Sequence, residues 1–385
     1  MKIRKFVRYK AMKLKKILLY VMMFTLVFAL FACGNEAAKD APESEESAEA
    51  TETTEESAGS ENSENPEGTE SGDGIVPSNT PYRSHLTGLP VASKEDEVRR
   101  PVAIMINNAK KALPQCGISK ASIIYEALAE GGITRLLAVF ENLEGIEQIG
   151  TIRSSRHYYI DFANSLDAIY VHIGGSPKAY EQLKSQKIDS FDLIEGANSD
   201  MYWRDNTRIK NNGYEHSVFT SGEKLLAKFE KKGTRMTTQK GNAYNFSEDV
   251  VYEGNDATKI SAEFSTYKTG TYTYDEESGL YRIGQYGAKH TDGLYGTQLA
   301  FKNVFVIHMK SWVIRGDEAG RLDFTSTGSG KGKYFVNGTA TDITWKREGK
   351  SSAFKYYTED GKELPVVPGD SYVAIVPIDA KVTVE

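Results

Sequence analysis

Cysteine is scarce in this sequence: Cys33 and Cys116 are the two cysteines among 385 residues. Their spacing excludes a CxxC metal site. The sequence also lacks an HExxH pattern and a GxSxG pattern, which are typical of zinc hydrolases and serine hydrolases. The most specific signatures of catalysis are therefore missing, and we expect neither a metal nor another cofactor.

Long apolar runs are scarce as well, and the one that stands out covers residues 17–31 (ILLYVMMFTLVFALF). The 16 residues before it carry eight basic residues and no acid. A basic segment followed by a short apolar run predicts a secretory signal peptide over residues 1–32. The run is short for a membrane-spanning helix, and its basic flank favours a cytoplasmic N-terminus.

The end of this run, LFAC (30–33), resembles a bacterial lipobox. The resemblance implies cleavage before Cys33 and attachment of lipid to its thiol, which anchors the protein to a membrane. An uncleaved anchor with an incidental cysteine is the alternative. A lipidated Cys33 leaves Cys116 without a disulfide partner, and we interpret Cys116 as a loop thiol because no histidine partner is evident.

Apolar residues are few in residues 33–75, which contain 14 acids and one base. Such a segment cannot bury enough apolar surface to offset its ordering entropy, so we expect a disordered, extended tether. The chain's net charge of −6 divides into +8 for residues 1–32, −13 for residues 33–75 and −1 for the rest. The nearly neutral folded part has no basic excess, and we therefore expect no nucleic-acid partner.

Strand and helix patterns alternate between residues 76 and 239. Periodicity and capping residues predict strands over 101–107, 134–141, 148–153 and 167–173, and helices over 120–130, 155–164, 177–187 and 221–231. Ser176 and Pro177 supply a favoured N-cap and first helical residue. This alternation predicts an N-terminal α/β-type domain with at least one parallel β-α-β unit.

Residues 240–385 instead alternate apolar and polar residues between turns such as Asp-Gly and Asn-Gly. This pattern predicts a C-terminal, mostly antiparallel β domain. GSGKGK (328–333) lacks the spacing of a phosphate-binding loop, and we interpret it as a hairpin loop. The expected fold class is therefore α+β.

The densest group of polar side chains lies in residues 151–163 (TIRSSRHYYIDFA), at the junction of a predicted strand and helix. Strand 148–153, helix 155–164 and strand 167–173 are expected to form one β-α-β unit, whose strands run parallel. The turn at 153–156 and the turn at 172–176 then leave the same edge of the sheet, where open α/β sheets bind ligands. We refer to these two turns as the seam.

Each turn of the seam opens a helix, whose free N–H groups attract an anion such as phosphate, carboxylate or a sugar acid. His172 is the candidate general acid or base. The candidate ligand-binding residues are Arg153, Ser154, Ser155, Arg156, His172, Gly174, Gly175 and Ser176, together with Arg135 and His216.

A purely structural interpretation accounts for the same residues. The serines would cap helices, the arginines would pair with Asp161 or Glu126, and His172 would be satisfied at its strand end. His216 fits either the same cleft or the surface. Glu126 and Glu130 would share a face of helix 120–130, where they suit a glycosidase, a metal or solvent, or Glu130 would pair with Arg135.

Several strings together resemble the YerB-like family of bacterial lipoproteins, which has no assigned function. Two departures are Cys116, where serine is expected, and Tyr372, where tryptophan is expected. The resemblance implies a membrane-anchored lipoprotein with an α+β N-terminal domain and a separate C-terminal domain. The strings are RPVAIMINN (100–108), PQCGISKASIIYEALAEGGITRLLAVF (114–140), IGTIRSSRHYYIDFA (149–163), DAIYVHIGGSP (167–177), EHSVFTS (215–221), KNVFVIHM (302–309), DITWKREG (342–349) and PGDSYVAIVP (368–377).

These observations favour a lipid-anchored, extracytoplasmic protein that binds an anionic cell-envelope ligand, such as a wall glycan, or a wall-synthesis protein. An envelope hydrolase or transferase centred on Arg153, Arg156 and His172 is the second hypothesis. A structural lipoprotein without a small-molecule site is the third.

Overall fold

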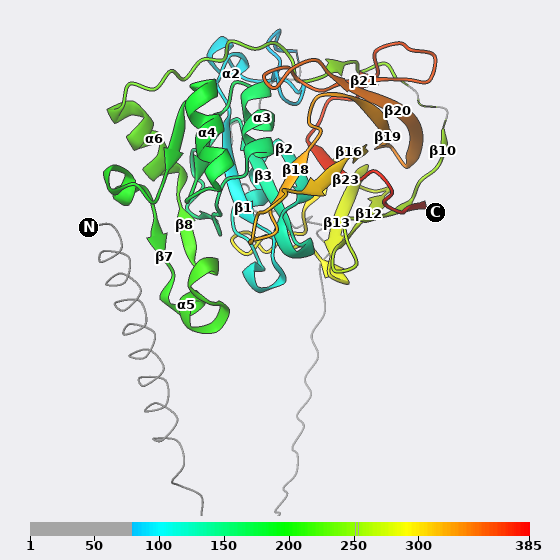
Figure 1. Ribbon diagram of the computed structural model, residues 1–385. Helices are drawn as coiled ribbons and strands as arrows, with labels where there is room; N and C mark the ends of the chain where they lie inside the picture. The colour runs from blue at the N-terminus through cyan, green and yellow to red at the C-terminus, as the bar shows by residue number, and fades with distance from the viewer. Residues whose placement is uncertain (1–78, 251, 253) are drawn as a thin grey trace, which may run out of the picture. The chain divides into compact units, whose positions relative to one another are not determined.

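The centre of the molecule is an eleven-stranded sheet that draws strands from both halves of the chain (Figure 1). The computed structural model describes residues 79–250, 252 and 254–385. The predicted signal peptide, the acidic tether and Cys33 lie outside these residues. Within the described part of the chain, no helix has the length and apolar character needed to cross a membrane.

The strand order of this main sheet is β10-β20-β19-β16-β23-β2-β3-β1-β5-β6, with β21 paired to β20. Six strands of the main sheet run in the same direction: β1, β2, β5, β6, β16 and β23. Strands β1 and β6 pair parallel with β5, and strands β2 and β16 pair parallel with β23. The two groups have the same direction because β3 is antiparallel to both β1 and β2. Their bounds are Val102–Asn107 (β1), Ile123–Leu128 (β2), Ile169–His172 (β5), Ser190–Asp192 (β6), Asn303–Met309 (β16) and Ser371–Pro377 (β23).

The other strands of the main sheet run against this direction or lie at its end. Strand β3 separates β2 from β1 and is antiparallel to both. The bounds are Thr134–Phe140 (β3), Asn255–Asp256 (β10), Gly328–Val336 (β19), Thr339–Arg347 (β20) and Lys355–Tyr357 (β21). The fold is α+β, as expected from the sequence.

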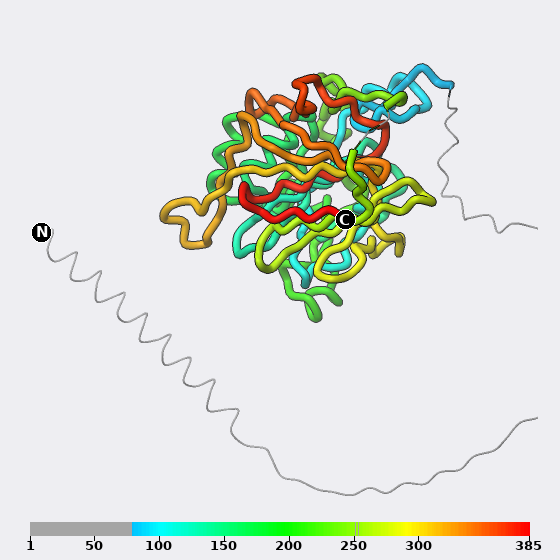
Figure 2. The backbone as a smooth tube through the Cα atoms, turned by 90° about the vertical axis from the view of Figure 1, so that its right-hand side faces the viewer, coloured from blue at the N-terminus to red at the C-terminus, as the bar shows by residue number. Residues whose placement is uncertain are grey.

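A second, six-stranded sheet is formed by antiparallel strands of the C-terminal half. Its members are β11 (Lys259–Glu263), β12 (Thr269–Asp275), β13 (Leu280–Gln285), β14 (Ala288–Lys289), β15 (Ala300–Phe301) and β24 (Val382–Val384). Smaller pairings join β17 (Ser311–Val313) to β18 (Leu322–Phe324), β9 (Asn245–Phe246) to β22 (Pro365–Val366), and β4 (Ile149–Gly150) to β8 (Val218–Thr220) and β7 (Trp203–Arg204). The β17–β18 hairpin stands out from the body of the molecule in Figure 2.

Helices α3 (His157–Ser165) and α4 (Pro177–Gln186) pack against each other in front of the main sheet in Figure 1. Ser176 accepts a hydrogen bond from Ala179 N at 3.2 Å and Pro177 begins α4, as predicted. Ser221 likewise caps α6 (Gly222–Lys231) by accepting from Lys224 N at 3.2 Å. Shorter helices are α2 (Lys94–Glu97) and α5 (Asn206–Asn212).

The predicted helix over 120–130 is wrong, because residues 123–128 form the fully buried strand β2. Ala, Leu and Glu favour a helix here, but β2 is enclosed between β3 and β23. Its partner β23 is almost 250 residues away in the chain, so the local pattern carried no trace of it. The predicted start of this helix instead contains a short 3₁₀ turn, Ile118–Lys120.

The predicted β-α-β unit over residues 148–173 is also wrong. Strand β4 is two residues long and pairs antiparallel with β8 outside the main sheet. The true parallel unit is β5-α4-β6. Residues 328–333 belong to strand β19, and the hairpin turn that follows it is Asn337–Gly338.

The boundary predicted near residue 240 stays a prediction. The described residues from both sides of it belong to one compact unit, and β23 of the C-terminal half pairs directly with β2.

Candidate functional site

The two turns of the seam lie side by side, even though the predicted sheet around them was wrong. Ser155 and Gly175 form a parallel β-bridge. Ser155 N donates to Gly174 O at 2.9 Å, and Ser176 N donates to Ser155 O at 3.2 Å. The seam follows the carboxyl end of β5, at the edge of the sheet where parallel strands commonly present ligand-binding loops.

Asp192, at the end of β6, fixes the HIGGSP turn from the neighbouring strand. Its Oδ1 accepts from Gly174 N at 2.7 Å, and its Oδ2 accepts from the Tyr180 hydroxyl at 2.7 Å. Gly174 has a φ of +69°, a left-handed conformation that glycine adopts without strain. An internal carboxylate therefore already occupies one of the backbone donors of this turn.

Arg135 and Arg156 share a single carboxylate, Glu130. Arg135 reaches Glu130 Oε1 at 2.7 Å, and the Arg156 Nε reaches Oε2 at 3.0 Å. Burial raises the pKa of Glu130, but the two guanidinium groups outweigh it and leave the pKa below its usual value. The Glu130–Arg135 ion pair was one of the predicted alternatives, and the structure confirms it. The predicted pairing of Arg153 and Arg156 with Asp161 or Glu126 is wrong, because they pair with Glu215 and Glu130.

Arg135 is almost fully buried, at the start of β3, and also donates to the Ser154 carbonyl. Burial, followed by the positive charges of Arg156 and Arg153, lowers the pKa of Arg135 to about 10. This guanidinium stays charged at neutral pH, and its hydrogen bond to the Ser154 carbonyl helps to fix the backbone of the seam.

Arg153 is held more loosely. Its guanidinium pairs with the carboxylate of Glu215 and approaches the Glu215 carbonyl at 3.4 Å. The Arg153 side chain is 22% exposed and that of Glu215 is 58% exposed. Solvent-exposed ion pairs contribute only about 0.2–1 kcal/mol to stability. An incoming anion can therefore replace Glu215 as the partner of Arg153, whereas Glu130 is held by two buried arginines.

The His172 side chain is buried and does not reach the surface of the seam. The side chain is fully buried, and Nδ1 lies 2.9 Å from Gly174 O. Burial lowers the pKa of His172, and nearby Asp192 offsets this only in part. A neutral imidazole without access to the surface cannot exchange protons with a substrate, so the geometry gives no support to His172 as a general acid or base.

The three serines have different environments. Ser155 is buried with Oγ 2.8 Å from the Tyr170 hydroxyl, and Ser176 caps α4. Neither Ser154 nor Ser155 caps α3, whose N-cap position is Arg156 and has no side-chain cap. Ser154 is partly exposed beside Gly174, and its hydroxyl has no hydrogen-bond partner within the described residues.

His216 is buried at the other side of Arg153, next to Glu215. Its Nδ1 lies 2.8 Å from the Asn107 side-chain nitrogen at the end of β1. Burial lowers the pKa of His216, with the charge of Glu215 opposing the shift. Its position makes it a support for the Glu215 loop rather than a surface histidine.

A further acid, Asp323 from the β17–β18 hairpin, covers the beginnings of α3 and α4. Asp323 Oδ1 lies 2.7 Å from His157 Nε2, and Oδ2 pairs with Lys178. Four internal carboxylates, those of Glu130, Asp192, Glu215 and Asp323, therefore surround the seam. The backbones of the candidate residues converge, but Arg135 and Arg156 pair with Glu130 whereas Arg153 pairs with Glu215.

Sequence reasoning missed a buried polar cluster centred on Glu126 and Lys268, which we name the inter-sheet cluster. The two side chains are each 1% exposed, and their charged atoms lie 3.0 Å apart. Glu126 also accepts from Asn108 at 2.9 Å, from Thr134 at 2.6 Å and from Tyr372 at 2.5 Å. The buried carboxylate is thus well hydrogen-bonded, and the Lys268 ammonium has this carboxylate and the rings of Phe264 and Tyr286 as neighbours.

The cluster extends from the main sheet into the six-stranded sheet. Gln115 donates to Asn108 Oδ1 at 2.8 Å and lies 2.9 Å from His290 Nε2. Burial, then the charge of Lys268, lowers the pKa of His290 to about 3. The signal that could have revealed this cluster is a lysine at 268 in an otherwise alternating β segment, but its partner is 142 residues away.

Metal or thiol chemistry finds no support in the part of the chain that the structure describes. It contains no group of three potential metal-ligating side chains. Cys116 is a buried free thiol, and burial raises its pKa to about 11. A protonated, enclosed thiol is not a nucleophile, in keeping with its interpretation as a loop residue.

Two family profiles match the chain in succession. Residues 86–235 match the N-terminal domain of a protein family of unknown function, DUF3048, and residues 260–373 match its C-terminal domain. The chain belongs to the DUF3048 family. This outcome confirms the resemblance to YerB-like proteins.

One relative in this family is YerB of Bacillus subtilis (strain 168), whose name carries a provisional assignment as a lipoprotein. YerB is 34% identical over 309 residues, which span 79% of this chain and 89% of YerB. The crystal structure of Bacillus subtilis YerB is similar, with a TM-score of 0.68 and 32% identity over 78% of this chain and 99% of that one. These comparisons establish the family and the fold of this chain, and the function of the family is unknown.

Proposed function

We propose that this DUF3048 protein is a lipid-anchored, extracytoplasmic protein that binds an anionic group of the cell envelope at the seam. In this proposal Arg153 is the binding cation, the Ser154 hydroxyl is a neutral donor, and the Gly174–Gly175 backbone allows close approach. The lipid on Cys33 and the acidic tether hold the folded part near the membrane. The lipoprotein name of the relative YerB supports this location.

One observation carries the proposal: the cations of the seam differ in how firmly they are held. Arg135 and Arg156 share the half-buried Glu130 and are themselves almost fully buried, so they form a fixed base. Arg153 instead pairs with an exposed carboxylate, and the free Ser154 hydroxyl is next to it in the chain. An incoming phosphate or carboxylate can replace Glu215 without leaving a buried charge unpaired.

Binding is favoured over catalysis because of His172. A hydrolase or transferase at the seam needs a group that exchanges protons at the surface, and His172 is enclosed with its Nδ1 directed to a backbone carbonyl. The hydroxyls of Ser155 and Ser176 are likewise occupied by structural hydrogen bonds.

The test is the affinity of the purified protein for two anionic probes, a short poly(glycerol phosphate) and a muramic-acid-containing wall fragment, by isothermal titration calorimetry. Replacing Arg153 by Gln should weaken binding about tenfold, because a charge-assisted hydrogen bond is lost. Replacing Glu215 by Gln should strengthen binding about two- to fivefold, since it removes the competing carboxylate.

The matched control is Arg282→Gln, which breaks another partly exposed ion pair, that of Arg282 on β13 with Asp275 on β12. This variant should bind like the unchanged protein. Weaker binding by Glu215→Gln, or equal affinities for all three variants, would contradict the proposal.

A further inference from the structure

The outer edge of the main sheet is interrupted in the middle of β20. Strand β10 pairs with Thr339 and Ala340, and β21 pairs with residues 344–346. Thr341, Asp342 and Ile343 have no strand partner on this side among the described residues. The interval from Ala340 to Thr344 spans roughly 13 Å at the rise of a β-strand, which is wide enough for one extended chain.

Asp342 directs its backbone N–H and C=O into this interval. The Ala340 carbonyl points outward, since its oxygen would lie only 2.5 Å from a Cβ on Gly254. In an antiparallel ladder, alternate residues direct both backbone groups to the same side, so Asp342 faces outward like Ala340. The open edge therefore offers one donor and one acceptor in strand geometry.

The chain on each side turns away before it can fill the interval. After Tyr357 the chain folds into a tight turn in which Thr358 N donates to Lys362 O at 3.0 Å and Gly361 N donates to Thr358 O at 2.9 Å. On the other side Gly254 precedes β10 and packs against the β20 backbone. The result is a hollow of about 590 Å³ lined by Gly254, Asn255, Ala340, Thr341, Asp342, Thr358, Glu359 and Asp360.

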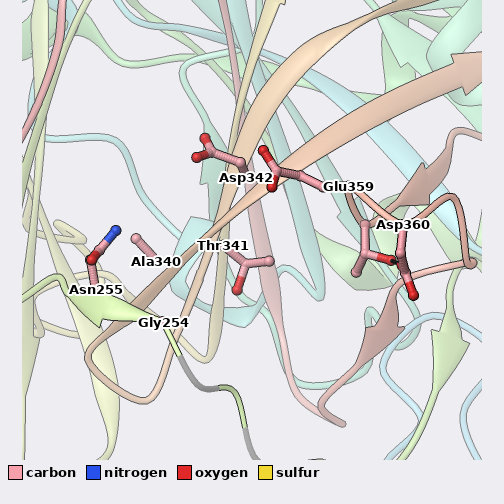
Figure 3. A pocket seen from close by; sticks show the side chains of 8 residues that line it. Gly254, Asn255, Ala340, Thr341, Asp342, Glu359 and Asp360 are labelled. Atoms are coloured by element: carbon pink, nitrogen blue, oxygen red, sulfur yellow. Dashed lines mark hydrogen bonds between the residues drawn. The ribbon is translucent and has the colours of Figure 1, made fainter.

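The charged side chains of this hollow are all acidic (Figure 3). Asp342 pairs with Lys333 at 2.6 Å, and Asp360 pairs with Lys362 at 2.7 Å. Glu359 is exposed and makes no hydrogen bond or ion pair within the described residues. Glu359 and Asp342 both line the hollow (Figure 3), and Glu359 is the carboxylate that is free to pair with an incoming cation.

We propose that this interval of β20 docks an extended, basic segment of a protein partner. The partner's backbone would form a β-bridge with the N–H and C=O of Asp342, and a lysine or arginine side chain would pair with Glu359. Main-chain pairing at an open strand edge is a common mode of peptide recognition, and the acidic lining selects the sign of the side chain.

The occupant is unlike the protein's own tether. Residues 33–75 carry 14 acids and one base, and their charge is repelled by Glu359 and its neighbours. The hollow lies at the opposite end of the strand order from β5 and the seam. Peptide docking at this hollow would therefore be independent of anion binding at the seam.

The test is fluorescence anisotropy of a labelled peptide, Val-Thr-Lys-Thr-Val, with the full-length protein in detergent micelles. The peptide should bind, and its glutamate counterpart Val-Thr-Glu-Thr-Val should not. Glu359→Gln should weaken binding about threefold and Glu359→Lys about tenfold, as expected for one exposed ion pair and its reversal. The control Glu276→Lys changes an exposed acid on the β12–β13 turn and should have no effect.

Hydrogen–deuterium exchange of the unchanged protein supplies a second readout that needs no substitution. The Asp342 amide should exchange freely in the unbound protein and become protected when the lysine peptide is present. Equal binding of the two peptides, self-association of the protein in place of peptide binding, or unchanged exchange at Asp342 would each overturn the proposal.

Discussion

Single residues set how this protein responds to pH, and Asp370 is the clearest case. This residue precedes β23, and burial, together with the nearby charge of Glu141, raises its pKa to about 7. Burial also raises the pKa of Glu141, which accepts a hydrogen bond from Ser84. Two carboxyl groups that disfavour each other's charge are most stable when at least one is protonated.

We predict that stability falls as pH rises through this range. The folded state holds the proton of Asp370 up to about pH 7, whereas an unfolded aspartate loses it near pH 4, so the free energy of unfolding decreases between these values. Asp370→Asn should remove this part of the decrease. The measurement is urea denaturation from pH 4 to 8 for both proteins, and parallel curves would show that Asp370 does not contribute.

For single residues, the sequence predicted the backbone conformation of the seam but not the ion-pair partners of most of its side chains. The Ser-Pro cap and the glycines are local signals, and they placed α4 and its turn correctly. Glu130 is five residues from Arg135, and that pair was among the alternatives. Glu215 is 62 residues from Arg153 and Asp323 is 166 residues from His157, so no spacing in the sequence could identify them.

At the scale of the element, strands with local signals were predicted and the strand that depends on distant partners was not. The apolar runs of β1, β3 and β5 match the structure closely. Strand β2 has a helical composition and becomes a strand only because β3 and β23 enclose it. The same enclosure buries Glu126, which a helix would have exposed.

The inter-sheet cluster joins two elements, β2 and the β11–β12 turn, and its pair should be strongly coupled. Lys268→Met leaves Glu126 buried without a counter-charge and should cost about 3–5 kcal/mol of the free energy of unfolding. The double variant Lys268→Met/Glu126→Gln should be more stable than Lys268→Met alone, because the unpaired charge is removed.

Urea denaturation of the unchanged protein, both single variants and the double variant measures this coupling. Lys184→Met, at an exposed position of α4, is the matched control and should change stability by less than about 0.5 kcal/mol. Additive losses in the two single variants would contradict the coupling.

At the scale of the whole molecule, the two halves of the chain share one sheet. Strand β23 from the C-terminal end pairs with β2 in the N-terminal half. Lys268, in the β11–β12 turn of the six-stranded sheet, forms an ion pair with Glu126 on β2. Two family profiles divide the chain between residues 235 and 260, yet the strand pairing crosses that division. The halves are therefore expected to unfold together rather than one after the other.

The proposed anchor also belongs to this scale, since it decides where the folded part works. We predict that cells supplied with labelled palmitate incorporate the label into the unchanged protein and that Cys33→Ser abolishes it. Cys116→Ser is the matched control and should keep the label, because Cys116 is buried. Label that persists in Cys33→Ser would contradict lipidation at Cys33.

The most direct test of the central claim is a crystal structure of the protein with bound poly(glycerol phosphate). We expect a phosphate within hydrogen-bonding distance of the Arg153 guanidinium and the Ser154 hydroxyl, with Glu215 displaced and with Arg135 and Arg156 still paired with Glu130. Arg153 still paired with Glu215, with the phosphate bound elsewhere or absent, would contradict it.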